Sequence, residues 1–517
     1  MNKRNTITGK SWVAALIAAL ILILYIGPNR IARAGQKAYN RLMLLTMVLD
    51  KIERYYVEEK DPNVLMESAI RGMIASLDPH TIYLTPAEYS AFKTRYQGYQ
   101  GIGLKYSRLQ DRLLVISVMP NSPASEKGLR PGDKIVRIAS KKVEFLGTDN
   151  IASLLQEAIV RLEIEREGFQ EPFSIALPKR TIPPVTIPCV CMLNDSTAYI
   201  KIDHFSDGTP EELDQAFSRL AIDTPSYLVL DLRDNGGGSF IAGIKVADRF
   251  LHAGKMIAYT RGRGPGANMQ YFATTGDKIP MWPLVLLVNN GSASDAEIVA
   301  GAIQDWDRGL IIGQSTYGKA LVQTEYAFQD GSALLLTTAR FLTPLGRSLQ
   351  KNEPSESRNE PARQVNDAGS TYRTPLGRIV HGGGSIVPDI DLPEETAPLS
   401  TALQSLITAE QNYFAEFADQ YFSSHPELGK NKEFFINRFQ VSDDMLRDFL
   451  IILRHSGAKF TLQDFGENKM QLQFLIKREI AALFWGEEAR YTINILADPE
   501  VIECGKYLKQ AQNLLAQ

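Results

Sequence analysis

Apolar residues between positions 185 and 392 follow two alternating patterns. Short apolar runs of strand length predict buried strands, and apolar residues at i, i+3 and i+4 spacing predict helices between them. The expected strands are "TAYIKIDHF", "YLVLDLR", "PLVLLVNN" and "GLIIG"; the expected helices are "TPEELDQAFSRLA", "FIAGIKVADRFL" and "DAEIVAGAIQDW". Alternation of strands and helices is typical of an α/β layer. The next segments, "LVQTEYAF" and "SALLLTTARFL", predict a β-hairpin.

The flanking segments have other patterns. Residues 36–94 show helical periodicity, and residues 95–180 are rich in strands, with an amphipathic helix expected at "NIASLLQEAIV". Residues 178–184, "PKRTIPP", predict a linker, and the polar residues 351–374 predict a surface insertion or mobile loop. Helical periodicity returns over residues 393–517, where no chemical motif is recognisable. The sequence therefore predicts a mixed α/β, multidomain protein.

The N-terminus resembles an export signal. Lys3, Arg4 and Lys10 precede an apolar, uncharged run from Trp12 to Gly27, and "ARA" at 32–34 fits a cleavage site. Both a cleaved signal and a membrane anchor over residues 1–35 are compatible with this pattern. Positive charges before the run place the rest of the chain outside the inner membrane. We expect a cell-envelope protein, anchored and facing the periplasm, or exported if the signal is cleaved.

Composition excludes some classes of partner and of site. The 517 residues exceed one ordinary core, and the net charge of −3 provides no field for nucleic acid. Cys189 and Cys191 have no second Cys/His pair nearby, so we expect no zinc site, no other metal site and no cofactor. The simplest interpretation of these cysteines is packing.

Residues 313–320, "GQSTYGKA", carry the glycine and lysine spacing of a phosphate-binding loop. Such a loop needs Ser or Thr after the lysine and a helix behind it, whereas Ala320 follows Lys319 and the next segment predicts a strand. A nucleotide site is therefore not expected. A lysine in an uncharged stretch can instead act as a base if burial lowers its pKa.

Ser294 stands at the start of an expected helix, in the small-residue turn "NNGSASDAE". The positive end of a helix dipole favours an alkoxide or oxyanion there. Alternatively, Ser294 is only a helix cap with Glu297 at the capping-box position. The turn "LDLRDNGGGS" at 230–239 ends another strand and could aim backbone N–H groups at an oxyanion.

Residues 289–323 resemble the signature of the carboxy-terminal processing proteases, the S41 family of serine endopeptidases. The resemblance implies a Ser294–Lys319 dyad on a fold like ClpP and crotonase, with Gln323 orienting the lysine. It also implies an oxyanion hole formed by the N–H of Asp295, where the family often has Ala, and by Gly237 or Gly236. Further similar segments lie at 71–89, 337–350 and 382–392, so the core is expected over 181–392, followed by a helical extension.

Residues 95–180 resemble a PDZ domain. Gly101, Ile102, Gly103 and Leu104 stand where PDZ domains bind a C-terminal carboxylate with backbone N–H groups. "SPASEKGLRPGDKIVRI" resembles the PDZ core turn and strand. The alternative is a plain structural β-domain. The resemblance implies that C-terminal peptide tails bind this domain.

Together these features predict a cell-envelope serine endopeptidase that cuts protein or peptide substrates near their C-termini, with a PDZ domain that recognises substrate or gates the site. The alternative is a catalytically inactive PDZ scaffold on the same fold. An inactive copy should have lost Ser294, Lys319 or Gln323, and all three are present. The C-terminal helices are candidates for contacts between copies of the chain.

Overall fold

The computed structural model describes residues 39–516, except 110, 275–279, 352–368, 394–398 and 410. The chain divides into two compact units, one up to Tyr83 and one from Leu84 onward. No helix of the described residues has the length and apolarity needed to cross a bilayer. The apolar run from Trp12 to Gly27, where we expect the signal or anchor, lies outside the described residues.

The first unit contains a helix over residues 39–55 and α2 (Pro62–Ile74). The Asp61 side chain caps α2 by accepting the Asn63 N–H. Both helices are expected from the sequence. The short strand β1 (Ile82–Leu84), which the sequence analysis did not predict, ends this part of the chain.

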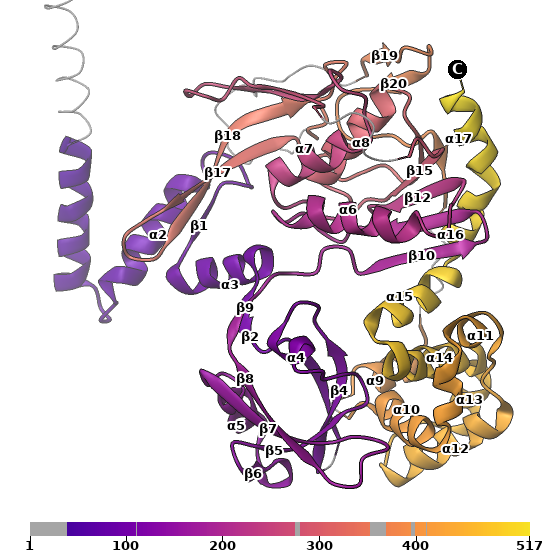
Figure 1. The fold of residues 1–517 in the computed structure, drawn as a ribbon. Helices are drawn as coiled ribbons and strands as arrows, with labels where there is room; N and C mark the ends of the chain where they lie inside the picture. Colours follow the sequence, from indigo (N-terminus) through magenta and orange to yellow (C-terminus); the bar gives the residue numbers. More distant parts are fainter. Residues whose placement is uncertain are drawn as a thin grey trace, which may run out of the picture. The chain divides into compact units, whose positions relative to one another are not determined.

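The second unit begins with α3 (Pro86–Gln97) and continues into a β-rich domain, coloured violet in Figure 1. Its sheet has the strand order β3-β4-β5-β7-β8, with β6 paired to β5. The elements are β2 (Tyr99–Gly101), β3 (Leu104–Leu109), β4 (Arg112–Val118), α4 (Pro123–Glu126), β5 (Lys134–Ile138), β6 (Lys141–Lys142), a 3-10 turn (Val143–Phe145), α5 (Thr148–Leu154), β7 (Ile159–Glu165), β8 (Phe173–Pro178) and β9 (Arg180–Ile182).

Two boundaries in this domain differ from the sequence prediction. The helix expected over residues 150–160 ends at Leu154, and Ile159 and Val160 start strand β7 instead. Val160 is fully buried in the domain core, so tertiary packing outweighs the helical periodicity. The expected linker contains strand β9, which pairs with β2 directly before the Gly101–Leu104 loop.

The α/β core is built on a sheet with the order β10-β11-β12-β15-β16-β21, parallel except for the antiparallel pair β10–β11. A second, antiparallel sheet joins β17, β18, β13 and β14. The elements are β10 (Cys189–Asn194), β11 (Thr197–Lys201), α6 (Thr209–Leu220), β12 (Tyr227–Asp231), α7 (Phe240–Asp248), β13 (Met256–Gly262), β14 (Gln270–Phe272), β15 (Leu284–Val288), α8 (Asp295–Asp305), β16 (Leu310–Gly313), β17 (Leu321–Ala327), β18 (Ala333–Leu342), β19 (Thr371–Arg373), β20 (Ile379–His381) and β21 (Ile390–Asp391).

Residues 352–368 of the expected polar insertion lie outside the described residues. Its residues Thr371–Arg373 form strand β19, which pairs with β20 across the turn 374–378. The β17–β18 hairpin agrees with the sequence prediction.

The C-terminal helices pack in two cores, and α15 contributes to both. They are α9 (Thr401–Ile407), α10 (Tyr413–Ser424), a 3-10 turn (Pro426–Lys430), α11 (Lys432–Arg438), α12 (Asp443–His455), α13 (Leu462–Glu467), α14 (Lys469–Trp485), α15 (Glu487–Leu496), α16 (Pro499–Cys504), a 3-10 turn (Gly505–Tyr507) and α17 (Leu508–Leu515). Helices α9 to α14 share a core with Leu114 and Ile116 of the β-rich domain.

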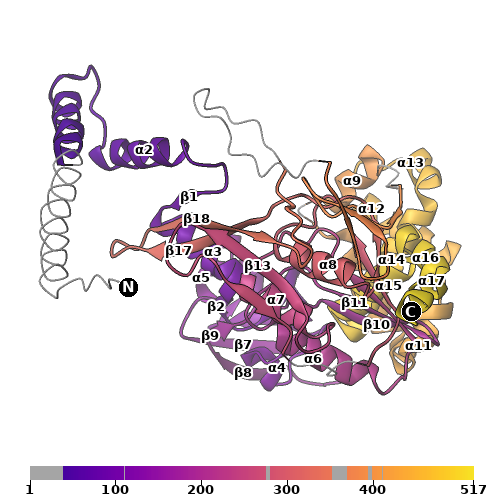
Figure 2. The ribbon, with the colours of Figure 1, turned by 90° about the horizontal axis from the view of Figure 1, so that it is seen from above.

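Helices α15 to α17 cover one face of the central sheet. Ile495, Val501, Cys504 and Ala511 pack with Val285 and other residues of that face, while α6, α7 and α8 cover the opposite face. Figure 1 shows α16 and α17 on one side of β12 and β15 and α6, α7 and α8 on the other. In the view from above in Figure 2, the same two groups of helices lie on the two sides of β11. A mostly parallel sheet needs cover on both faces, so the C-terminal helices complete the core.

Candidate active site

Three loops meet where β12, β15 and β16 end. These strands are parallel neighbours, so their carboxyl ends lie at one edge of the sheet, where α/β proteins place their sites. The Ala293 N–H donates to the Asn235 carbonyl oxygen (2.9 Å), and the Tyr317 N–H donates to the Ser292 carbonyl oxygen (2.9 Å). The glycine turn, the serine turn and the lysine segment are thus in direct contact.

The buried carboxylate of Glu297 ties the serine turn to the lysine segment. Its Oε2 accepts the N–H groups of Ser294 (3.0 Å) and Lys319 (2.8 Å). Its Oε1 accepts the Gly318 N–H (2.9 Å) and the Thr316 hydroxyl (2.5 Å). Burial raises the pKa of Glu297 to about 7, while these donors oppose the rise. One side chain therefore sets the distance between the backbones that carry Ser294 and Lys319.

Lys319 lies in a tight, partly buried segment. Its Nζ donates to Gln323 Oε1 at 3.1 Å, so the two residues that the sequence analysis pairs are in contact. Gly318 has φ +90°, and a Cβ there would come within 1.9 Å of the Gly384 carbonyl oxygen. Ala320 is fully buried, its N–H donates to Gln350, and strand β17 follows it. Gly318 is therefore needed for close packing against the backbone of Gly384, and a strand, not a helix, follows Lys319.

Ser294 has an unusual backbone conformation for a residue other than glycine. Its φ of +57° and ψ of −110° lie in a sparsely populated region that costs about 1–3 kcal/mol. The Glu297 N–H donates to the Ser294 carbonyl oxygen (2.9 Å). A Cβ at Gly237 would come within 2.8 Å of the Ser294 Cβ, so only glycine fits there. This packing places the glycine turn against the Ser294 side chain.

The N–H groups of the glycine turn are partly occupied by side chains. Gly237 donates to Asn235 Oδ1 (2.9 Å), and Gly238 donates to the buried Asp295 Oδ2 (2.6 Å). The Gly236 N–H forms no hydrogen bond with another described residue. Asp295 is the first residue of α8, so its own N–H has no acceptor within the helix. The Gly236 N–H group is therefore available to a ligand, whereas the Asp295 N–H interacts with its own buried carboxylate.

Behind the glycine turn lies a network of charged side chains that no pattern in the sequence predicts. Arg233, 11% exposed, pairs with the buried Asp231 (2.6 Å) of β12 and with Asp498 (2.8 Å) and Glu500 (2.6 Å) beside α16. Burial alone would raise the pKa of Asp231. The positive charges of Lys201 and Arg233 lower the pKa by more than burial raises it, so it lies well below its usual value. The C-terminal helices thus hold the strand end that leads into the glycine turn.

No local signal marks Asp498 and Glu500, which lie in "ADPEV" more than 260 residues from Arg233. The turns around Ser294 and the three glycines also contain Glu297, Asp231 and Arg233. Their contacts in the structure show that Glu297 joins the serine turn to the lysine segment and that Asp231 and Arg233 join the glycine turn to α16. Among the described residues, no group of three or more His, Cys, Asp or Glu side chains could hold a metal ion.

Comparison with known proteins identifies the family. The model of peptidase family S41 matches residues 196–356, and the model of the PDZ domain matches residues 114–166. The carboxy-terminal-processing protease of Bartonella bacilliformis is 32% identical over 61% of this chain and 74% of the relative. This chain belongs to the carboxy-terminal processing proteases of family S41.

Two further relatives support this assignment. The protease CtpA of Bacillus subtilis is 30% identical over 66% of this chain and 73% of its own length. The chloroplastic C-terminal processing peptidase of Tetradesmus obliquus is 32% identical over 58% of this chain and 69% of its own length. The protein is therefore a serine peptidase, as the sequence resemblance predicted, and the β-rich domain is its PDZ domain.

In the PDZ domain, the Gly101–Leu104 loop connects β2 to β3. The Ile102 carbonyl oxygen accepts the Ala124 N–H (3.0 Å), and the Gly103 carbonyl oxygen accepts the Met119 N–H (2.9 Å). Gly103 has φ +84°, and a Cβ there would come within 2.1 Å of the Ser122 Cβ. Leu104 begins β3, which lies at the edge of its sheet among the described strands. An edge strand can pair with an added peptide.

The contact between Arg233 and the C-terminal helices predicts an effect on turnover. The double variant Asp498→Asn, Glu500→Gln leaves Arg233 without two of its carboxylate partners, so the glycine turn is held less firmly. We expect kcat to fall about tenfold, a loss of about 1.4 kcal/mol in transition-state stabilisation, with KM little changed. Steady-state kinetics on a peptide substrate measure both constants.

The matched control is Glu503→Gln on the same helix, where Glu503 pairs with the exposed Lys506. This variant should keep the kcat of the wild type. An unchanged kcat in the double variant would show that the network does not support the site.

Asp295 predicts a pH dependence of stability. Burial raises its pKa from 3.8 to about 6, while the Gly238 N–H and Lys319 lower it. The folded protein therefore holds the proton more tightly than the unfolded chain does. The resulting stabilisation is complete below about pH 4 and is lost as the pH rises through about 6, a change of about 3 kcal/mol.

Asp295→Asn keeps an acceptor for the Gly238 N–H and removes the titration. The wild type should therefore lose about 3 kcal/mol of unfolding free energy relative to this variant between pH 4 and pH 7. Chemical denaturation of both proteins across this range, followed by tryptophan fluorescence, gives the difference. A constant difference would mean that Asp295 does not titrate in this window.

Proposed function

We propose that this serine peptidase hydrolyses peptide bonds near the C-termini of protein substrates with Ser294 as nucleophile and Lys319 as base. Neutral Lys319 takes the proton of Ser294, and the alkoxide attacks the peptide carbonyl. Gln323 orients the lysine through the bond to its Nζ. The tetrahedral intermediate then collapses: Lys319 gives the proton to the leaving amine as the peptide C–N bond breaks, and the acyl-enzyme remains. Water, deprotonated in turn by Lys319, hydrolyses the acyl-enzyme and restores Ser294. The observation that carries the proposal is the bonding of Glu297 to both backbones, which holds the two residues in one site.

The oxyanion of the tetrahedral intermediate needs N–H donors in a fixed position. The Asp295 N–H at the start of α8 is one proposed donor, supported by the positive end of the helix dipole. The second donor is Gly237 or Gly236. Gly237 packs against Ser294 but already donates to Asn235, whereas the Gly236 N–H is available.

The PDZ domain is proposed to bind the C-terminus of the substrate. Backbone N–H groups of the Gly101–Leu104 loop would hold the terminal carboxylate, and the peptide would pair with the edge strand β3. Binding there brings the substrate to the enzyme or gates access to Ser294. The names of the curated relatives, carboxy-terminal processing proteases, agree with cleavage near a C-terminus.

The dyad is tested with Ser294→Ala, Lys319→Ala and Lys319→Arg. Each should reduce cleavage of an unfolded protein to background, because alanine cannot react and arginine cannot become neutral. Mass spectrometry of the fragments measures cleavage and its distance from the C-terminus, and circular dichroism checks the fold. Ser218→Ala and Lys245→Ala, on the outer sides of α6 and α7, should cleave normally. Full turnover by any of the three dyad variants would refute the assignment.

The protease is proposed to work in the cell envelope, anchored by residues 1–35 or exported after their removal. The basic residues before the apolar run support this location. Protease added to intact spheroplasts should degrade the protein, and mass spectrometry of its N-terminus separates an anchor from a cleaved signal. Protection from the added protease would contradict export.

A further inference from the structure

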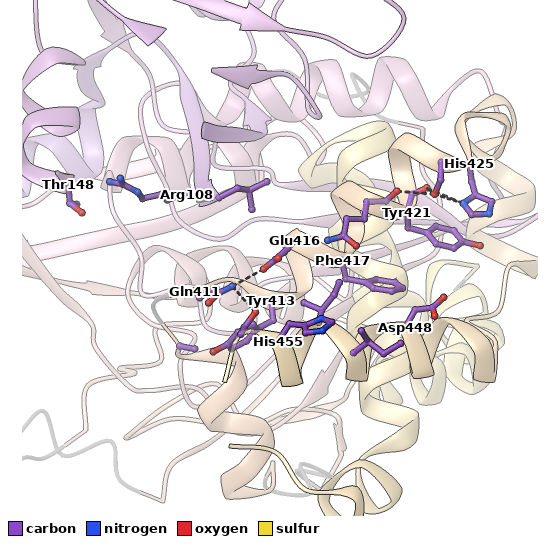
Figure 3. Close-up of a pocket in the computed structure, with 17 residues that line it drawn as sticks. Arg108, Thr148, Gln411, Tyr413, Glu416, Phe417, Tyr421, His425, Asp448 and His455 are labelled. Atoms are coloured by element: carbon purple, nitrogen blue, oxygen red, sulfur yellow. Dashed lines mark hydrogen bonds between the residues drawn. The ribbon is translucent and has the colours of Figure 1, made fainter. Parts of the chain in front are cut away.

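A cavity of about 1070 Å³ lies between the PDZ domain and the C-terminal helices. Arg108 and Leu109 at the end of β3 and Thr148 at the start of α5 form one side. The other side comes from α10 and α12, as the labelled residues of Figure 3 show. None of the residues around Ser294 lines it. Its volume slightly exceeds the upper end of the range of small-molecule sites, about 1,000 Å³, so it has room for several residues of a peptide.

The cavity lies at the end of the proposed peptide groove. A peptide with its carboxylate at the Gly101–Leu104 loop pairs antiparallel with β3, so the peptide runs upstream toward Leu109. Strand β3 has six residues, which pair with about six peptide residues over about 20 Å. Residues further from the peptide C-terminus then leave the groove at Arg108, Leu109 and Thr148, at the mouth of the cavity.

The two sides of the cavity are held together by other contacts. Lys134 of β5 pairs with Asp419 of α10 at 2.9 Å, and both side chains are largely buried. Leu114 and Ile116 of β4 pack into the core of the C-terminal helices. The cavity is therefore a fixed feature of the second unit and does not depend on one contact.

The lining suits an extended polypeptide with apolar side chains. Phe417 and Ile452 are buried, whereas Ile451 is 50% exposed. Tyr413 is only 9% exposed, and its hydroxyl bonds to no other described residue, so it can serve a ligand.

The charges of the lining argue against an anionic ligand. Arg108 on the PDZ side faces a lining that includes Glu416 and Asp448, so the charges are mixed. Gln411 at the rim donates to Glu416 (2.8 Å) and to Ser456 (3.1 Å), the bonds that are drawn in Figure 3. A free phosphate or a nucleic acid would meet carboxylates here, whereas a peptide backbone would meet both donors and acceptors.

We propose that this cavity is a second peptide-binding subsite, which takes apolar residues of the substrate that lie more than about six positions before its C-terminus. The proposal rests on the proposed binding of substrate C-termini by the PDZ domain. It assigns to the C-terminal helices a part in selecting substrates by the sequence upstream of the terminus.

The test compares two fluorescein-labelled peptides with the same last six residues. The longer peptide carries six further residues upstream, including leucine and phenylalanine. Their affinities for the full-length Ser294→Ala protein are measured by fluorescence anisotropy. We expect the longer peptide to bind about tenfold more tightly. Ile451→Glu, which puts a charge on the cavity wall, should remove this gain and leave the affinity for the shorter peptide unchanged.

The matched control is Ile502→Glu on α16, where the isoleucine is 61% exposed and lines no part of the cavity. This variant should keep the gain, and thermal melts should show that both variants fold. Equal affinity for the two peptides, or a gain that survives Ile451→Glu, overturns the subsite and leaves the PDZ proposal standing. Failure of both peptides to bind overturns the PDZ proposal and the subsite together.

Discussion

The central sheet must bury two apolar faces, and the C-terminal helices bury one of them. Strands β12, β15 and β16 alternate between residues that face α6 to α8 and residues that face α15 to α17. Without α15 to α17, residues such as Val285 and Leu287 would meet water. The site lies at the ends of these same strands, so its geometry depends on a segment outside the matched S41 model.

Ion pairs also join α16 to the end of strand β12. Asp231 ends β12 with no exposed surface, and a buried carboxylate of this kind needs partners for its charge. Arg233 supplies one partner, and its own remaining donors are taken by Asp498 and Glu500. Removing one member of such a network leaves a buried charge without compensation, which costs more than the contact contributed. The ion pairs of Arg233 therefore hold the start of the glycine turn in place.

Much of the fold could be predicted from the sequence because the core strands are short apolar runs with turn residues after them. The meeting of the glycine turn, the serine turn and the lysine segment could be predicted because strand ends collect at one edge of the sheet. The choice of Ser294, Lys319 and Gln323 within these segments rests on the resemblance to the S41 signature. The end of α5 could not, because Val160 follows a helical period but packs as a strand. The contact of Arg233 with Asp498 joins residues 265 positions apart, and no local pattern records such a contact.

The C-terminal helices contact both the PDZ domain and the site, so they provide a physical path between peptide binding and chemistry. A path alone does not establish coupling, which requires an element with two arrangements that both sites influence. The glycine turn is the element whose hydrogen bonds would differ between two such arrangements. Its Gly237 and Gly238 N–H groups are held by Asn235 and Asp295, and a donor held this way must be released before it can stabilise an oxyanion. If Gly237 is the second donor, the described geometry is a resting state, and the Arg233 network is the contact through which the C-terminal helices would favour one arrangement. If Gly236 is the donor, the turn can act as it stands, and the same network serves only to keep it in place.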